Sequence, residues 1–188
     1  MRAVVLLSLI AVALAQQPSQ CPGPSAFSGR FRRIDRERQY FVDGRIWYDE
    51  LNRRVREFEA EEIGRDREFI DRLVLYNLNI EYTVNLRNRT CTVSAPRRPF
   101  VPYGVPPDAR FQGEGTAGVV GKPGEEVTLA MFSGTFSGEN YFVSVTEPDC
   151  FPVQFGLLGN QSFFHQEFYD VVEGINDPEA FIPPQSCL

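Results

Sequence analysis

The chain has 188 residues, of which 43% are hydrophobic, and a formal net charge of −6. Its length is that of one domain with a sizeable core, which excludes an array of several domains. The longest apolar run, of thirteen residues near the start, is too short to span a bilayer, and no later run approaches the roughly eighteen residues that a membrane-spanning helix needs.

The charges are unevenly spread. Residues 16–110 carry 17 Arg against 14 acidic residues, a formal +3, whereas residues 111–188 carry only Lys122 against 11 acidic residues, a formal −10. Two interpretations stay open: two solvated surfaces of one domain, or an acidic face that attracts Ca²⁺, which prefers oxygen ligands. No D-x-[DN]-x-[DN]-G calcium loop is present, so no metal-ligating residue is assigned.

The first fifteen residues predict a signal peptide. Met1-Arg2 precedes a thirteen-residue apolar run that ends in Ala13-Leu14-Ala15. A short positive segment, an apolar stretch and an A-x-A site are typical of secretory signals. We therefore expect residues 1–15 to be removed and residues 16–188 to form a single secreted β-domain.

The mature chain opens with strand signals. Residues 26–35 and 39–48 read as strands, and Asp43-Gly44 is a hairpin turn signal. Residues 49–63 are ambiguous, because Leu51, Val55 and Phe58 have helical spacing while Arg54-Val55-Arg56 can equally begin a strand. The local pattern alone slightly favours a helix.

The strongest pattern lies at residues 74–86, where every even position is apolar and only Leu75 is apolar among the positions between. This alternation predicts a strand with one face in the core and the other toward water. Thirteen extended residues would span roughly 43 Å, which is long for a strand. A break near Asn77-Leu78-Asn79 is expected, giving two paired strands.

The second half of the chain is also β-rich. Five prolines and a glycine make residues 96–110 a long connector rather than part of a ladder. Short runs rich in β-branched and aromatic residues follow at 109–115, 126–134, 140–147, 153–158 and 162–172. Ser137 to Asn140 makes a hairpin, and Asp177-Pro-Glu-Ala predicts one helical turn in the tail. About eleven strands in all indicate an antiparallel two-sheet or barrel-like domain.

Four cysteines in an exported chain imply two disulfides, and Cys21, Cys91, Cys150 and Cys187 allow three pairings. The spacing contains no CxxC and does not suit a zinc site. Asn88-Arg-Thr90 and Asn160-Gln-Ser162 are N-glycosylation acceptors in predicted turns.

No catalytic set is credible. Gly113 to Gly118 matches G-x-G-x-x-G, but no helix can begin in the following Val-Val-Gly-Lys-Pro-Gly, so these glycines are interpreted as a loop. The single histidine, His165, has no G-x-S-x-G elbow with it and is interpreted as a surface residue. The 16 Phe, 7 Tyr and one Trp fit either a filled core or an aromatic-lined cavity between sheets.

An ordered set of short motifs resembles the ependymin family over almost the whole mature chain. In the first half these are Cys21-Pro-Gly-Pro-Ser-Ala-Phe-Ser-Gly29-Arg30, Trp47-Tyr48-Asp49 with Arg53-Arg54-Val55-Arg56, and Leu73-Val-Leu-Tyr76 followed by Tyr82 and Cys91. In the second half they are Val105-Pro106 through Ala109 and Phe111, Val145-Thr146 with Asp149-Cys150-Phe151-Pro152, and Gly174-Ile175-Asn176-Asp177-Pro178 with Phe181, Pro183-Pro184 and Cys187.

The resemblance implies a fold, a disulfide pairing and an assembly. The fold is two stacked antiparallel β-sheets, a half-open barrel or sandwich similar to bacterial lipoprotein carriers, that enclose a hydrophobic pocket. Residues 53–62 then form a strand, against the local pattern, because sheet partners outweigh propensity. The implied disulfides are Cys21–Cys150 and Cys91–Cys187, one fewer than in relatives with six cysteines. The protein is expected to form a homodimer through a sheet face.

The resemblance also implies a secreted, sometimes lysosomal, non-enzymatic glycoprotein that binds calcium. The sequence thus predicts a protein that holds a lipid or fatty acyl chain between its sheets; no pocket-lining residue can be assigned. The alternative is an extracellular adhesive or structural glycoprotein that contacts matrix in a calcium-dependent way. Neither function uses a catalytic cofactor or nucleic acid.

Overall fold

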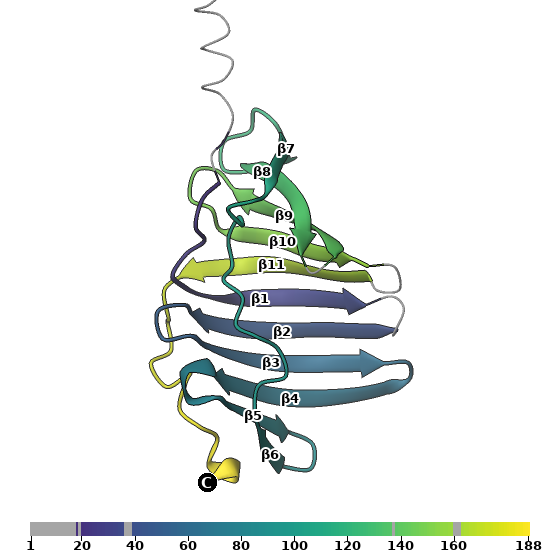
Figure 1. Cartoon of the computed structure of the whole chain (residues 1–188), viewed down its shortest axis with the longest axis vertical. Helices are drawn as coiled ribbons and strands as arrows, with labels where there is room; N and C mark the ends of the chain where they lie inside the picture. The colour runs from purple at the N-terminus through teal and green to yellow at the C-terminus, as the bar shows by residue number, and fades with distance from the viewer. Residues whose placement is uncertain (1–17, 19, 36–38, 137, 160–162) are drawn as a thin grey trace, which may run out of the picture.

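A computed structural model describes residues 18, 20–35, 39–136, 138–159 and 163–188. Eleven strands form one antiparallel sheet in the order β6-β5-β4-β3-β2-β1-β11-β10-β9-β8-β7 (Figure 1). The strands are β1 (Ala26–Asp35), β2 (Tyr40–Asp49), β3 (Arg54–Ile63), β4 (Asp66–Leu75), β5 (Ile80–Asn85), β6 (Thr90–Ser94), β7 (Arg110–Gly118), β8 (Glu126–Phe136), β9 (Glu139–Thr146), β10 (Pro152–Leu158) and β11 (Phe163–Glu173). Two 3₁₀ turns, η1 (Tyr76–Leu78) and η2 (Gln185–Cys187), complete the elements. The predicted mainly β, half-open antiparallel fold is confirmed, and its strands form one continuous sheet that does not close.

The break predicted within residues 74–86 is confirmed. Strand β4 ends at Leu75, η1 follows, and Asn79 adopts a left-handed conformation with φ 56° before β5 begins. Asparagine tolerates this region better than most residues, because its short polar side chain can bond locally. The turn therefore forms close to Asn77-Leu78-Asn79, the point at which the long alternating segment was expected to break.

Two local predictions about β2 and β3 are wrong. Asp43-Gly44 does not form the hairpin, because both residues lie inside β2, where Asp43 pairs with Ala60 and Gly44 with Glu59. The favoured helix across residues 49–63 is also wrong. Residues 54–63 are strand β3, which pairs along its full length with β2 and β4. Two neighbouring ladders outweigh the helical spacing of a few apolar residues.

The sheet has an inner and an outer face, each covered by a different segment. We call the face under the connector, residues 95–109, the inner face; the connector crosses the sheet in front of it (Figure 1). The outer face is partly covered by the C-terminal segment, residues 174–188. Cross-strand partners share a face and neighbours along a strand alternate, so the register assigns each side chain. Tyr48, for example, faces inward with its partner Phe27, and Trp47 faces outward.

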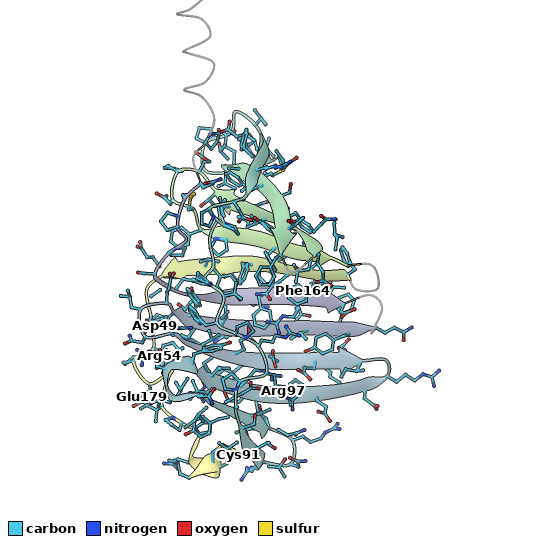
Figure 2. All side chains as sticks on the ribbon, viewed as in Figure 1. Asp49, Arg54, Cys91, Arg97, Phe164 and Glu179 are labelled. Carbon is cyan, nitrogen blue, oxygen red and sulfur yellow. A yellow bond between two sulfur atoms is a disulfide. The ribbon has the colours of Figure 1, made fainter. Side chains whose placement is uncertain are left out.

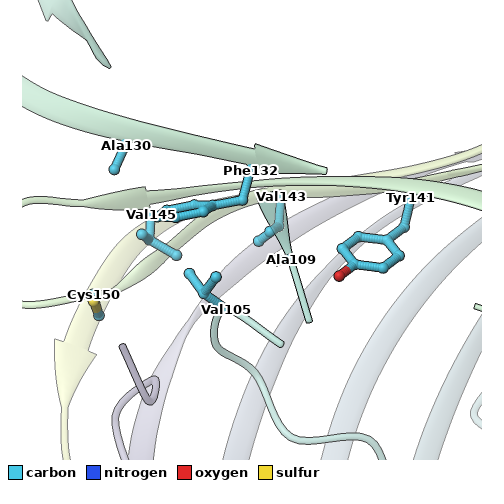
Figure 3. Packing of buried hydrophobic residues seen from close by; sticks show 8 residues of the cluster. All are labelled: Val105, Ala109, Ala130, Phe132, Tyr141, Val143, Val145 and Cys150. Atoms are coloured by element: carbon cyan, nitrogen blue, oxygen red, sulfur yellow. The ribbon is translucent and has the colours of Figure 1, made fainter. Parts of the chain in front are cut away.

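One core lies under the end of the inner face formed by β8, β9 and β10. Its buried strand residues are Ala130, Phe132, Tyr141, Val143 and Val145, and the connector contributes Val105 and Ala109 (Figure 3). The Cys21–Cys150 disulfide borders this cluster. The connector is thus part of the core and not a free linker.

The C-terminal segment builds a smaller core on the outer face. Ala180 and Phe181 pack with Leu73, which is fully buried, and Trp47 lies at the edge of the cluster. Trp47 Nε1 donates to Asn176 Oδ1 at 3.2 Å. The predicted helical turn is present as a turn in which the Ala180 N–H donates to the Asp177 carbonyl.

The expected exposure of residues 74–86 is wrong at several positions, because both faces of the sheet are partly covered and the turn changes which face each position takes. Val74 faces inward with its partner Glu81, while Leu75 and Ile80 are partners on the outer face. Glu81, expected to point toward water, is 4% exposed, and Leu86, expected in the core, is 45% exposed. The turn at η1 therefore places even positions on opposite faces before and after it.

Candidate ligand-binding face

Aromatic side chains gather at the centre of the inner face. Phe27, Phe31, Tyr48 and Phe168 come from β1, β2 and β11 and are almost completely buried. The rings of Phe27 and Phe168 meet edge-on at 5.9 Å, and Phe27 lies 5.2 Å from Tyr48. Edge-on and tilted contacts are favourable for aromatic pairs, so these rings make a fixed apolar floor.

The connector places two more rings on this floor. Phe100 stacks on Tyr48 with centroids 5.7 Å apart and an interplanar angle of 4°. Tyr103 meets Phe27, Tyr48 and Phe168 edge-on, at 5.6, 4.9 and 5.0 Å. The connector's Phe100 and Tyr103 therefore cover the apolar surface at the centre of the inner face.

Beside the rings lies a buried ionic network. Arg33 of β1 donates to Glu57 at 2.7 Å and to Glu59 at 3.1 Å, both on β3. Its Nε also donates to Gln166 of β11 at 2.9 Å. The Glu59 side chain is fully buried and that of Glu57 is 10% exposed. Because a buried charge is costly unless paired, Arg33 is held in one position by three partners.

The network continues toward the edge of the sheet. Arg72 of β4 donates to Glu59 at 3.1 Å and to Glu81 of β5 at 2.9 Å. Glu81 also accepts the backbone N–H of Arg97 at 3.3 Å, which joins the network to the connector. The inner face thus has an aromatic half over β1, β2 and β11 and an ionic half over β3, β4 and β5.

Carboxylates outnumber guanidinium groups in this network. Burial raises the pKa of Glu57; Arg33 opposes this shift, and the neighbouring Glu59 carboxylate adds to it. A raised carboxyl pKa means that the folded protein holds the proton of Glu57 more strongly than the unfolded chain. The ionic half is therefore sensitive to acidic pH at one buried position.

Two open hollows lie along the outer face. One of about 280 Å³ is lined by residues that include Arg30, Trp47 and Asn176. A second of about 480 Å³ lies over β1 to β5 and is lined by Arg30, Asp43, Arg45, Phe58, Phe69 and Leu86, among others. Phe69 and Leu86 remain 42% and 45% exposed. The outer face thus keeps an apolar patch beyond the reach of the C-terminal segment.

Both disulfide pairings implied by the resemblance are present. Cys21–Cys150 and Cys91–Cys187 join residues 129 and 96 positions apart. Asn88 is exposed in the turn between β5 and β6, as a glycan acceptor must be, while Asn160 and the predicted signal peptide, residues 1–15, lie outside the described residues.

The glycine-rich segment and the single histidine both lie on strands. Gly113 to Gly118 lie in strand β7 and not in the loop that was expected. His165 is half-buried on β11, with Nε2 3.3 Å from the Gln154 side chain. Within the described part of the chain, no group of three or more His, Cys, Asp or Glu side chains is placed to hold a metal ion. No described helix is long and apolar enough to cross a bilayer.

Sequence reasoning missed the ionic network and the two connector rings. Glu57, Glu59 and Glu61 alternate with Phe58 and Ala60 along β3, a pattern that is usual for a solvated face. In the folded sheet these carboxylates are removed from water, where they pair with Arg33 and Arg72 beneath the connector. The one available signal was the pair of aromatic residues, Phe100 and Tyr103, among the prolines of the connector.

Comparisons with known proteins agree with the motif pattern. The family model named Ependymin matches residues 64–187. Mammalian ependymin-related protein 1 of Rattus norvegicus is 25% identical over 175 residues, covering 90% of this chain and 77% of the relative. Ependymin-2 of Carassius auratus is 24% identical over 187 residues, covering 98% and 87%.

A solved structure shares the fold of this chain. An uncharacterised conserved protein from Thermus thermophilus superposes with a TM-score of 0.52 at 10% identity, covering 86% of this chain and 87% of that one. A LolA-superfamily protein from Nitrosomonas europaea superposes with a TM-score of 0.35 at 7% identity, covering 90% and 91%. The family model covers well over half of the sequence, and the chain belongs to the ependymin family.

Proposed function

We propose that this protein is a secreted, non-catalytic carrier that binds a hydrophobic ligand, a lipid or fatty acyl chain, on the inner face of its sheet. The observation that carries the proposal is the aromatic floor of Phe27, Phe31, Tyr48 and Phe168 on a sheet that stays open. Here the connector contributes Phe100 and Tyr103 to the cover over the floor.

Apolar surface supplies the binding energy. Each methylene group removed from water contributes about 0.8 kcal/mol, so an acyl chain of about a dozen carbons can bind in the micromolar range after ordering costs. The floor continues toward β10 through Phe155, Leu157 and Phe164, which are half-buried and face inward. Phe164 and Phe155 meet at 6.3 Å. These side chains extend the apolar surface of the inner face beyond the aromatic floor.

Titration with a fluorescent fatty acid tests the proposal. We expect saturable binding that unlabelled lipid displaces and that salt hardly changes, because burial and not charge drives it. Phe164→Ala, on the inner face, should weaken binding several-fold (Phe164 is labelled in Figure 2). Val172→Ala is the matched control, since Val172 lies on the same strand but faces outward and is 53% exposed. Equal effects of the two variants, or no saturable binding, would count against a ligand on the inner face.

The outer-face patch supports a homodimer, the assembly that the resemblance implies. Phe41, Phe69 and Leu86 are each exposed by more than two fifths on one face, beside mixed charges from Arg45 and Asp43. A patch with both signs of charge can pair with its own copy across a two-fold axis. Phe69→Asp should convert the dimer to a monomer in light scattering. Val120→Asp, in the β7–β8 turn and 76% exposed, should leave the mass unchanged.

The rival function is calcium-dependent cell–matrix adhesion by an extracellular glycoprotein. Native mass spectrometry separates it from the carrier. Lipid that co-purifies with the protein supports the carrier, whereas a bare protein that associates only when Ca²⁺ is added supports adhesion. Delivery to the lysosome, which the resemblance also implies, is tested by localising the tagged protein in cells.

A further inference from the structure

The proposed ligand face is covered by the chain's own aromatic side chains. The Phe100 ring lies parallel to and offset from that of Tyr48, and Tyr76 meets Phe100 edge-on at 5.2 Å. Arg53 lies over the same ring at 5.5 Å from its centroid. Phe100 is therefore surrounded by Tyr48, Tyr76 and Arg53. Its ring occupies the apolar site that an acyl chain would bind.

The backbone in the middle of the connector makes few described hydrogen bonds to the sheet. Between residues 96 and 103, the backbone N–H groups with described partners bond to side chains: Arg97 donates to Glu81 at 3.3 Å and Tyr103 donates to Tyr48 Oη at 3.3 Å. Pro96, Pro99 and Pro102 have no N–H to donate. The two aromatic rings thus provide most of the attachment.

Both ends of the same segment are held firmly. On one side it follows β6, which carries Cys91 of the Cys91–Cys187 disulfide. On the other side Gly104 forms a β-bridge with Pro22, and the Val105 N–H donates to the carbonyl of Cys21 at 3.1 Å. Cys21 is itself linked to Cys150. The segment can therefore leave the floor without losing its place on the molecule.

We infer that residues 96–103 are a displaceable cover of the ligand face: Phe100 and Tyr103 occupy the apolar floor in the empty protein, and an incoming apolar ligand replaces them. This inference rests on the proposed function, since it concerns access to the same face. Replacement keeps the floor out of water in both states. The closed state then competes with the ligand. The apparent affinity equals the affinity of the open state multiplied by the fraction of molecules that are open.

Removing the Phe100 ring tests the competition. An aromatic pair contributes about 0.5–1.5 kcal/mol beyond its burial, so Phe100→Ala should raise both the association rate and the apparent affinity for a fluorescent fatty acid by roughly three- to tenfold. Val101→Ala is the control, because Val101 is the next residue and is 56% exposed. A lower affinity of Phe100→Ala would overturn the inference, since it would make the ring a fixed wall of the pocket.

Hydrogen exchange provides a readout that does not depend on ligand affinity. In the lipid-free protein, Phe100→Ala should speed exchange at the amides of residues 97–103 and leave β1 unchanged, whereas Val101→Ala should leave both unchanged. Added fatty acid should speed exchange of the same amides in the natural protein; slower exchange there would overturn the cover. If no fatty acid binds, the proposed function fails, while unchanged exchange in lipid-free Phe100→Ala overturns the cover separately.

Discussion

Phe31 of β1 and Gly44 of β2 are cross-strand partners, and the ring lies directly over the glycine. A Cβ added at Gly44 would lie 2.7 Å from Cζ of Phe31 and 2.6 Å from the carbonyl oxygen of Phe58. Both are closer than a carbon can approach without movement. The same arrangement recurs where Tyr141 covers Gly134 and Phe142 covers Gly156. Strand glycines here accept an aromatic ring from the neighbouring strand.

Gly44→Ala should therefore destabilise the protein by about 1–3 kcal/mol, the usual cost of overpacking a core. Chemical denaturation measures the change in the free energy of unfolding. Gly115→Ala is the matched control, because its added Cβ would meet only the terminal methyl of Met131, at 3.7 Å. The explanation fails if both substitutions have the same effect.

Glu57→Gln should change how stability depends on pH. The pKa of Glu57 is raised above its ordinary 4.5, chiefly by burial, so the ionised form costs stability. The destabilisation caused by ionised Glu57 is absent below pH 4.5. It grows as pH rises from 4.5 to the raised pKa of the folded protein and is constant above that pKa. Relative to the natural protein, Glu57→Gln should gain stability as pH rises from 4.5 to the folded pKa of Glu57.

Denaturation at a series of pH values measures that gain. Glu62→Gln serves as the control, because Glu62 lies on the same strand but is half exposed and pairs with Arg67 at 3.4 Å. Parallel pH profiles for Glu57→Gln and the natural protein would contradict the raised pKa.

Phe181→Ala should loosen the C-terminal segment. The ring is 8% exposed, packs with Leu73 and carries Arg54 at 4.1 Å above its face. Deleting a buried aromatic ring costs about 3–5 kcal/mol in a rigid core. We expect a loss toward the lower end, since a tail can relax. Ile182→Ala, 55% exposed at the next position, should cost little in the same thermal melt.

Replacing Cys91 and Cys187 together by serine should destabilise the protein by about 2–5 kcal/mol. The bridge ties β6, an edge strand, to the end of the chain. Hydrogen exchange should accelerate in β6 and in residues 174–188 and stay unchanged in β9, which lies near the other bridge. Non-reducing peptide mapping should first show Cys21–Cys150 intact; a Cys21–Cys91 link in the natural protein would contradict the described pairing.

Asn88 should carry an N-glycan when the protein is made in eukaryotic cells, and the same is predicted for Asn160. Asn88 is exposed, and its Oδ1 accepts the Thr90 hydroxyl at 2.6 Å, which leaves the amide nitrogen facing solvent. Enzymatic deglycosylation should lower the mass of the natural protein by two glycans and that of Asn88→Gln by one. An unchanged mass would rule out both sites.

Local sequence signals were sufficient wherever structure depends on neighbouring residues. Short runs of β-branched and aromatic residues located the strands from β7 to β11, the excess length of the 74–86 pattern placed the turn before Asn79, and the prolines of residues 96–110 ended the ladder. An even cysteine count indicated two bridges, but spacing alone left three pairings open. The ordered motifs were needed to choose among them.

Only tertiary structure decided which side chains are buried. Glu57 and Glu81 alternate with apolar residues as solvated side chains do, yet a connector from elsewhere in the chain covers them and Arg33 and Arg72 pair with them. Strand β3 is a strand because β2 and β4 pair with both of its edges, although its own spacing is helical. Periodicity reports on the two faces of a segment. It carries no information about a distant segment that later covers one of them, because that contact depends on how the whole sheet curves and where its loops return.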